Sequence, residues 1–308
     1  MPTLYVTHPS FADHLVPPGH PERPERMRAV DQALEAEAFQ SLIRAEAPLA
    51  EAQVATLAHP AAYVEALERR RPREGMVRID GDTVMSPGTW EALLRALGGA
   101  TFAVDEVMTG RARGAFCGHR PPGHHAEAAL AMGFCFFNTA VVAAKHAQRA
   151  HGAERVAIVD FDVHHGNGTQ SLVWSDSSVF YASTHQMPLF PGTGARSETG
   201  VGNIVNAPMR SGDGGKKFYE AFDEAILPSL RTFAPDLLII SAGFDAHTRD
   251  PLGGLELTAE DYGWMTRALM DAAGPTTNGR VVSLLEGGYD LRGLAQSAAV
   301  HVRALMGA

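Results

Sequence analysis

Two short apolar segments, each followed closely by acidic and histidine residues, constrain the fold of this chain more than any other feature. The first segment, 156–159, leads directly into Asp160, Asp162 and His164, and a second apolar segment ends shortly before Asp245. Short, β-branched-rich segments predict strands that are buried on both faces, as in a parallel sheet. Ligands bind beyond the carboxyl ends of such strands, so both segments deliver their polar residues to one region. Two aspartates and a histidine can hold a divalent metal there and leave a position open for water and substrate.

Alternate residues of an extended chain share a face, which predicts how the first cluster is arranged. Asp162 and His164 would point together at one ion, and Asp160, one step earlier, would orient a neighbouring group. An Asp-x-His sequence by itself is common by chance. Asp245, arriving from another strand, makes the metal site the favoured interpretation.

Alternation of strand-like and helix-like segments predicts an α/β fold with a mainly parallel central sheet, in one domain over residues 1–308. The predicted strands lie near residues 5–6, 114–117, 155–160, 178–184, 203–207, 236–242 and 280–285. The predicted helices cover about 24–39, 61–70, 87–109, 138–150, 216–233, 258–273 and 291–306.

Composition argues against several classes of function. The net charge is −9 and no basic patch stands out, so we expect no nucleic-acid partner. No segment approaches the roughly 18 consecutive apolar residues of a membrane span, and the first residues lack the pattern of a leader peptide, so we expect neither. Cys117 and Cys135 do not form a C-x-x-C pair, so we expect no disulfide framework. We therefore expect a location in the reducing cytoplasm.

Two further motifs carry residues suited to hydrolysis. His124 and His125 follow a Pro-Pro-Gly sequence, and imidazoles that titrate near neutral pH suit proton transfer beside a metal. The default interpretation of such a pair is a polar surface loop. Tyr289 ends a Glu-Gly-Gly-Tyr sequence after a predicted strand and could aim its hydroxyl at a developing oxyanion. Standing alone, it would be interpreted as a tyrosine packed at a turn.

A series of motifs resembles those of the zinc-dependent histone deacetylase family. They occur in order as Arg-Pro-Pro-Gly-His-His, Gly-Phe-Cys-Phe-Phe-Asn, Asp-x-Asp-Val-His-His-Gly-Asn-Gly-Thr, Phe-Pro-Gly-Thr-Gly, Ser-Ala-Gly-Phe-Asp-Ala and Glu-Gly-Gly-Tyr. The resemblance extends from about His8 to Tyr289. The chain is most similar to class II-like bacterial members, which include histone deacetylase-like amidohydrolases and acetylpolyamine amidohydrolases. The fold implied is the arginase–deacetylase three-layer αβα sandwich.

The resemblance also implies metal ions. Asp162, His164 and Asp245 correspond to the ligands of one Zn²⁺ per chain. A structural K⁺ is implied nearby, with side chains or backbone carbonyls from Asp160, Asp162, His164, Ser183 and Thr184.

Catalytic roles follow from the same resemblance. His125 corresponds to the general base and then general acid, and Asn167 to the residue that supports it. His124 corresponds to an electrostatic partner that Asp160 orients. Tyr289 corresponds to the residue that polarises the acyl carbonyl.

The substrate tunnel is implied at Phe134 and Phe190, its aromatic walls, with Gly133 beside them. Outside the motifs both phenylalanines would be assigned to the core. Leu252 stands where acetylpolyamine-selective eukaryotic relatives carry a glutamate, which favours acyl-lysine over acetylpolyamine as the acylated amine. Asp82, by default a turn residue, is the candidate that anchors the substrate backbone or amine.

Two other classes of function compete with the deacetylase interpretation. A ureohydrolase with the same fold would need carboxylates for a second metal, but Gly166 and His247 stand at those positions. A non-catalytic acyl-ligand-binding protein would not need the catalytic residues. All of the catalytic positions named above are intact in this chain, which argues against that class. An acetylpolyamine deacetylase remains an alternative. The sequence also leaves open the preferred length of the acyl group, the identity of the native metal (Zn²⁺, iron or cobalt) and whether the chain forms a homo-oligomer.

Overall fold

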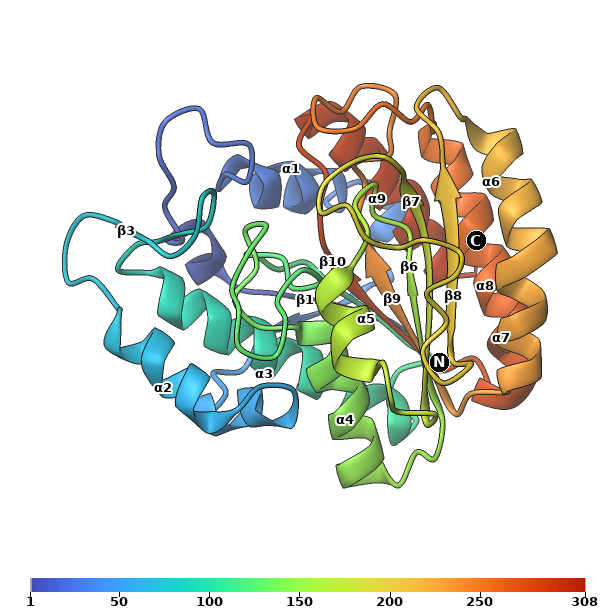
Figure 1. Cartoon of the computed structure of the whole chain (residues 1–308), viewed down its shortest axis with the longest axis horizontal. Coiled ribbons are helices and arrows are strands. Elements are labelled where there is room, and N and C mark those ends of the chain that lie inside the picture. Colours follow the sequence, from blue (N-terminus) through green and yellow to red (C-terminus); the bar gives the residue numbers. More distant parts are fainter. Residues whose placement is uncertain (1, 308) are drawn as a thin grey trace.

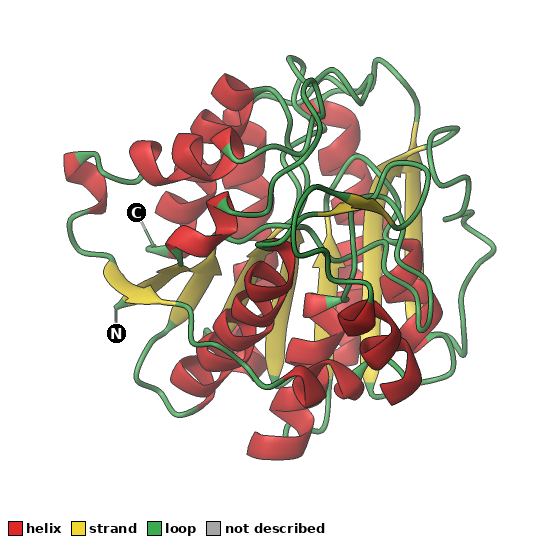
Figure 2. Ribbon diagram, turned by 90° about the vertical axis from the view of Figure 1, so that its left-hand side faces the viewer, coloured by secondary structure: helices red, strands yellow, loops and turns green. Residues whose placement is uncertain are grey.

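A central sheet of eight parallel strands runs through the protein, with helices on both faces (Figure 1; Figure 2). The computed structural model describes residues 2–307. The strand order is β2-β1-β5-β10-β9-β6-β7-β8, and every neighbouring pair is parallel. The strands are β1 (Thr3–Thr7), β2 (Ile43–Glu46), β5 (Gly114–Cys117), β6 (Val156–Asp160), β7 (Val179–Gln186), β8 (Ile204–Met209), β9 (Leu237–Ala242) and β10 (Val281–Leu285). This confirms the predicted αβα architecture.

Helices form the two outer layers. α3, α4 and α5 pack against one face of the sheet, and α1, α8 and α9 cover the other, where α6 and α7 extend the layer. None of the helices among the described residues has the length and apolar character needed to cross a membrane. The helices are α1 (Glu25–Ala33), α2 (Ala61–Arg69), α3 (Thr89–Met108), α4 (Thr139–His151), α5 (Asn167–Val173), α6 (Gly215–Ala221), α7 (Leu227–Phe233), α8 (Ala259–Thr277) and α9 (Leu291–Leu305).

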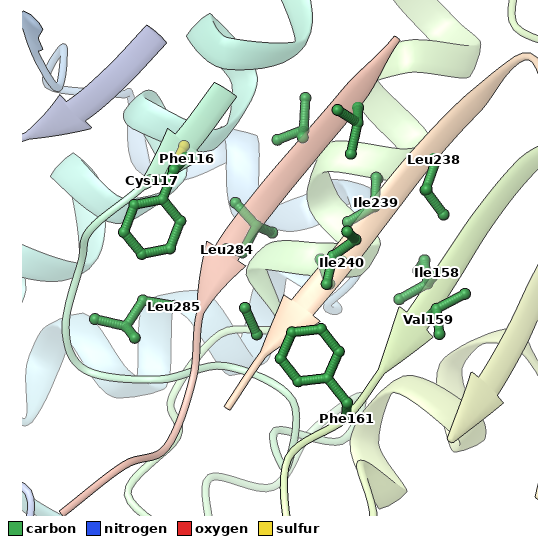
Figure 3. Packing of buried hydrophobic residues seen from close by; sticks show 14 of the residues in the cluster. Phe116, Cys117, Ile158, Val159, Phe161, Leu238, Ile239, Ile240, Leu284 and Leu285 are labelled. Carbon is green, nitrogen blue, oxygen red and sulfur yellow. The ribbon is translucent and has the colours of Figure 1, made fainter. Parts of the chain in front are cut away.

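The core lies along the central strands β6, β9 and β10. Ile158, Ile239, Ile240 and Leu284 are completely buried there, between the two helical layers (Figure 3). Helices on both faces exclude water from both sides of these strands, which explains why they are continuous apolar runs. Each such side chain contributes roughly 1.5–3 kcal/mol by leaving water, and together they hold the strand ends in register.

One predicted helix is wrong in length. The helix expected over 24–39 ends at Ala33, and a separate 3-10 turn covers Glu37–Phe39. Leu34 and Phe39 are both buried. Five positions of a continuous α-helix would place these side chains about 140° apart. The break lets both enter the core.

The short elements that were not predicted include four named ones: strand β2, the two-residue strands β3 (Val77–Arg78) and β4 (Val84–Met85), and α5. β2 lies at the edge of the sheet and is mostly exposed, so its sequence lacks the apolar run of a buried strand. The helix expected over 216–233 is interrupted by the π-helical turn Phe222–Ile226. α7 follows this turn directly, and its second residue, Pro228, has no N–H to donate to a regular helix.

Candidate active site

The site lies at the carboxyl ends of the adjacent central strands β6, β9 and β10. Asp160, the last residue of β6, is in register with Ser241 of β9, and Leu285 at the end of β10 pairs with Ala242. The segments that follow these strands therefore begin side by side. Such a position at the strand ends is where open α/β sheets bind their ligands.

Asp162, His164 and Asp245 come together as the sequence predicted. Their ligand atoms lie within 4.8 Å of one another, and all three side chains are buried. His164 Nδ1 is 3.1 Å from both an Asp162 and an Asp245 oxygen. Burial raises the pKa of Asp245 to about 7, and the neighbouring Asp162 charge adds to this effect. Two carboxylates and one imidazole, all buried and converging on one point, are donor types that Zn²⁺ takes, so this set fits a divalent cation such as Zn²⁺.

Asp162 and His164 point to the same place for a different reason from the strand alternation that the sequence predicted. Asp162 and His164 do not lie in a strand, because β6 ends at Asp160 and a loop follows. Within the loop, Asp160 Oδ1 accepts the Asp162 N–H (3.1 Å), and Asp162 Oδ1 accepts the His164 N–H (2.9 Å). These side-chain-to-backbone hydrogen bonds, typical of aspartate in turns, orient the two residues.

Glycines let the backbone approach the acidic groups closely. A Cβ atom on Gly243 would lie 2.0 Å from an Asp162 oxygen, and one on Gly287 would lie 2.1 Å from an Asp245 oxygen. The Gly287 N–H donates to Asp162 Oδ2 at 2.8 Å. Any side chain at these two positions would displace a metal-ligand candidate.

The histidine pair lies beside the acidic cluster. His124 Nδ1 is 3.0 Å from Asp160 Oδ2, and His125 Nδ1 is 2.8 Å from Asn167 Oδ1. The amide nitrogen of Asn167 donates to Glu127 (2.8 Å), which turns its oxygen toward His125. Because this oxygen can only accept, Nδ1 of His125 carries the proton and Nε2 is left as the basic nitrogen.

The two histidines have opposite electrostatic environments. Burial opposes the charged form of His124, but Asp162 and Asp160 outweigh it and raise its pKa well above the ordinary value. Burial lowers the pKa of His125 well below that value, and the positive charge of His124 lowers it further. The arrangement therefore favours a protonated His124 beside a neutral His125 that can accept a proton.

A cavity of about 290 Å³ leads to these groups. Gly133 lies against the His125 ring, where a Cβ would be 2.5 Å from the imidazole, so only glycine fits. Phe134 packs edge-on to Tyr289, and Phe190, which is 42% exposed, packs edge-on to His125. The cavity is lined by Asp82, His125, Gly133, Phe134, His164, Leu189, Phe190, Leu252 and Tyr289.

The β3–β4 pair carries Asp82 to the rim of this cavity. His20 supports the rim: its Nδ1 accepts the Glu22 N–H, so its Nε2 donates to the Asp82 carbonyl (3.1 Å). The His20 ring also packs edge-on to Phe134, with ring centroids 4.8 Å apart. On sequence grounds the proline- and glycine-rich loop 17–23 is a candidate for shaping this rim, but nothing in the sequence distinguishes His20 from its neighbours in that loop.

Buried charges that the sequence did not reveal support Tyr289. The Arg26 guanidinium lies 5.0 Å from the centre of the Tyr289 ring and donates to the Gly288 carbonyl (2.6 Å). Glu22 pairs with Arg26 (2.9 Å) and Arg120 (2.7 Å). In the sequence, Glu22 stands just before the predicted helix 24–39 and Arg26 stands in its first turn, and nothing in this spacing signals burial.

Asp250 holds Tyr289 from the other side. Its Oδ2 accepts the backbone N–H of Tyr289 at 2.6 Å, and its Oδ1 accepts that of Leu252 at 3.0 Å. One carboxylate thus positions two residues of the cavity wall. The Asp-Pro-Leu-Gly sequence could have indicated this, since aspartate before proline commonly begins a turn.

The residues expected to bind K⁺ lie beside the metal cluster. Ser183 of β7 is in register with Asp160, and its hydroxyl is 2.8 Å from His185 Nδ1. Within residues 2–307, the buried Thr184 hydroxyl has no hydrogen-bond partner. Binding of K⁺ stays a prediction.

A larger hollow of about 730 Å³ lies near Arg113 and Asn278, where β5 and β10 begin. None of the residues expected at the active site lines it. The smaller cavity, which reaches His125, His164 and Tyr289, is therefore the candidate active site.

Comparison with known proteins identifies the family. The histone deacetylase domain model matches residues 20–305. "Probable deacetylase" of Archaeoglobus fulgidus is 39% identical, covering 95% of this chain and 83% of its own length. "Histone deacetylase-like amidohydrolase" of Pseudomonas aeruginosa is 36% identical, with coverages of 88% and 73%. The crystal structure of the HDA15 HD domain superposes with a TM-score of 0.94 at 36% identity, over 99% of this chain and 88% of that one. The chain therefore belongs to the histone deacetylase family and is a hydrolytic deacetylase.

Proposed function

We propose that this enzyme is a zinc-dependent amidohydrolase that removes acetyl or other acyl groups from the side-chain amine of acyl-lysine. The observation that carries the proposal is a narrow, partly apolar cavity that ends on His125, His164 and Tyr289. Its aromatic and aliphatic walls suit the methylene stem of a lysine side chain. Its inner end supplies a base and a hydroxyl beside a metal-binding cluster.

The chemistry follows from the protonation states of the chain's own residues. A divalent ion held by Asp162, His164 and Asp245 would supply Lewis acidity to the carbonyl and to the attacking water. His125 Nε2 accepts the water proton and afterwards returns a proton to the leaving amine.

Tyr289 stabilises the developing negative charge. Burial raises the pKa of its hydroxyl well above 10, and Asp245 adds to this effect, so the hydroxyl stays protonated. It can therefore donate to the acyl oxygen as that atom becomes an oxyanion. Removing one such donor typically costs a factor of about 10²–10³ in kcat.

Acyl-lysine is favoured over acetylpolyamine because Leu252, not an acid, forms part of the cavity wall. Acetylpolyamine remains the second candidate because Asp82 is the one carboxylate among the described lining residues. At the rim, this carboxylate could meet either a distal ammonium or a peptide backbone N–H.

Steady-state kinetics of the zinc-loaded enzyme on an acetyl-lysine peptide and on N-acetylputrescine test the proposal. We expect a higher kcat/KM for the peptide, and a shift toward N-acetylputrescine in Leu252→Glu. Tyr289→Phe serves as the catalytic control and should lower turnover of both substrates. A large advantage for N-acetylputrescine in the wild-type enzyme would replace the acyl-lysine proposal with the polyamine one. Absence of turnover of either substrate would favour a non-catalytic binding role.

We extend the proposal to the ions and the location. We infer one Zn²⁺ per chain and a K⁺ near Asp160 and Ser183, and a cytoplasmic enzyme in which the buried Cys117 and Cys135 stay reduced. Removal of divalent metal with a chelator should abolish turnover, and one equivalent of Zn²⁺ should restore it. Turnover that survives complete metal removal would contradict the zinc assignment.

A further inference from the structure

We propose that Asp105, His146 and His151 form a second divalent-metal site, separate from the active site and suited to Zn²⁺, Co²⁺ or Ni²⁺. One ligand atom from each residue lies within 4.8 Å of the other two. Two imidazoles and a carboxylate are the donor types that zinc takes in sites with three protein ligands and a water.

The geometry brings both imidazoles to one carboxylate oxygen. The Nε2 atoms of His146 and His151 lie 2.7 Å and 2.6 Å from Asp105 Oδ1. The two rings are inclined at 75°, so they approach that oxygen from different directions. Zinc bonds of about 2.0–2.1 Å at tetrahedral angles would separate the ligand atoms by roughly 3.3 Å. An outward movement of less than about 1 Å would therefore make room for an ion.

The tertiary structure alone creates this cluster. Asp105 lies in the last turn of α3, His146 lies in α4, and His151 is the final residue of α4. Five positions along a helix correspond to about 500°, so the two histidines leave α4 in different directions. They meet only because Asp105 of the adjacent helix lies between them.

The electrostatics favour a cation here. Partial burial alone would raise the pKa of Asp105, but hydrogen bonds from His151 and His146 outweigh it and lower the pKa. The carboxylate is therefore ionised. The side chains are between 18% and 40% exposed, so an ion can reach them from solvent. Arg111, a nearby cation, is paired with Glu106 at 2.6 Å.

Binding would require the protons of both imidazole rings to leave Nε2. Because a carboxylate oxygen only accepts, both Nε2 atoms carry protons in the observed arrangement. Before Nε2 can coordinate, a neutral ring must move its proton to Nδ1, and a charged ring must release one to solvent.

The site lies far from the catalytic groups. α4 begins directly after its N-cap Asn138, whose side chain donates to Thr169 of α5 near the active site, and the 13 residues of α4 span about 20 Å. His151 ends α4 just before β6 begins, whereas the active site follows the other end of β6. In Figure 1, α4 reaches the lower edge of the molecule while the arrowheads of β8 and β9 point upward. An ion here would link α3 to α4 without touching substrate.

Zinc titration of enzyme that already holds one equivalent tests the proposal. Metal content after equilibrium dialysis and isothermal titration calorimetry should show a second Zn²⁺ per chain. The double variant His146→Gln/His151→Gln should bind it at least tenfold more weakly and keep the first equivalent and its turnover. His8→Gln, a histidine outside both clusters, is the matched control and should retain both ions.

Two additional measurements distinguish loss of the metal site from misfolding of a variant. Asp105→Asn has almost the same shape and should also weaken the second equivalent at least tenfold. Excess Zn²⁺ should raise the melting temperature of the wild-type enzyme beyond its one-equivalent value, but not that of the variants. Saturation of the wild-type enzyme at one Zn²⁺ per chain would overturn the proposal. A second ion that binds the variants as tightly as the wild type would overturn it equally.

Discussion

At the scale of single residues, the decisive feature is the chain of contacts that selects which nitrogen of His125 is basic. Glu127 orients the Asn167 amide, and the amide oxygen holds the proton on Nδ1 of His125. Asn167 was predicted as the support of His125 from the family resemblance. The role of Glu127 was not predicted, because a glutamate that acts only by orienting another side chain belongs to no recognisable sequence motif.

Replacing Glu127 with Gln should lower kcat by about tenfold to a hundredfold, part of the roughly 10²–10⁴ that a positioned base contributes. The reason is that Gln can accept as well as donate, so the Asn167 amide can turn its NH₂ toward His125 and favour the wrong tautomer. KM and zinc content should change little. Measured kcat, KM and pH–rate profiles, with Glu127→Asp as the conservative variant that recovers part of the rate, check this. An unchanged kcat in Glu127→Gln would show that the amide orientation does not depend on Glu127.

At the scale of elements, local sequence signals predicted most helices and strands correctly wherever tertiary packing favoured the same structure as the local sequence. The start of α8 is an example, because Thr258 and Asp261 form a capping box there. The Asp261 carboxylate accepts the Thr258 backbone N–H at 2.7 Å. The end of α1 is the contrary case, since the packing of Leu34 and Phe39 ends that helix early. A capping box is encoded within four residues, whereas the break after α1 depends on a core that distant segments build.

Thr258→Ala should lower the free energy of unfolding by about 1 kcal/mol, the usual cost of losing a helix N-cap. Urea unfolding followed by circular dichroism measures this change. Thr232→Ala is the matched control: this exposed threonine of α7 bonds only within its own helix, to the Pro228 carbonyl. Alanine has the higher helix propensity, so the control should be neutral or slightly stabilising. Equal losses in the two variants would contradict the capping role.

At the scale of the whole molecule, many of the 14 histidines are buried, and several of these make hydrogen bonds in the interior as well as at the active site. His301 is completely buried between α8 and β10, with its ring nitrogens 2.6 Å from the Thr266 hydroxyl and 2.8 Å from the Ser283 hydroxyl. Burial lowers the pKa of His301 to about 3. His165 and His185 are lowered to about 3 and about 4, chiefly by the same cause.

These shifts predict a loss of stability in acid. Below pH 6.5 the unfolded chain takes up a proton at His301 and the folded chain does not, so unfolding becomes easier as the pH falls from 6.5 toward 3. The loss approaches about 1.4 kcal/mol per pH unit for one such group. In His301→Gln the free energy of unfolding should be lower at pH 7, but should fall less steeply between pH 6.5 and 4.

Urea unfolding at several pH values measures that slope. Thr266→Val is the control, since it removes a partner of His301 and keeps the titrating ring; it should lower stability while leaving the acid slope steep. Identical slopes in His301→Gln and the wild-type enzyme would place the acid sensitivity elsewhere in the molecule.

The sequence by itself determined the αβα class, the order of the main elements and the family, because short apolar strand segments and contiguous motifs are local properties of the chain. It also brought Asp162, His164 and Asp245 to one place, since the carboxyl ends of parallel strands share an edge. Only the tertiary structure decided how they converge, through loop hydrogen bonds rather than strand alternation. It alone buried Glu22, Arg26 and Arg120 behind Tyr289, and brought Asp105 between two histidines of α4. Such contacts join residues up to about 260 positions apart, and their energies depend on burial and distance, which no local pattern in a single sequence records.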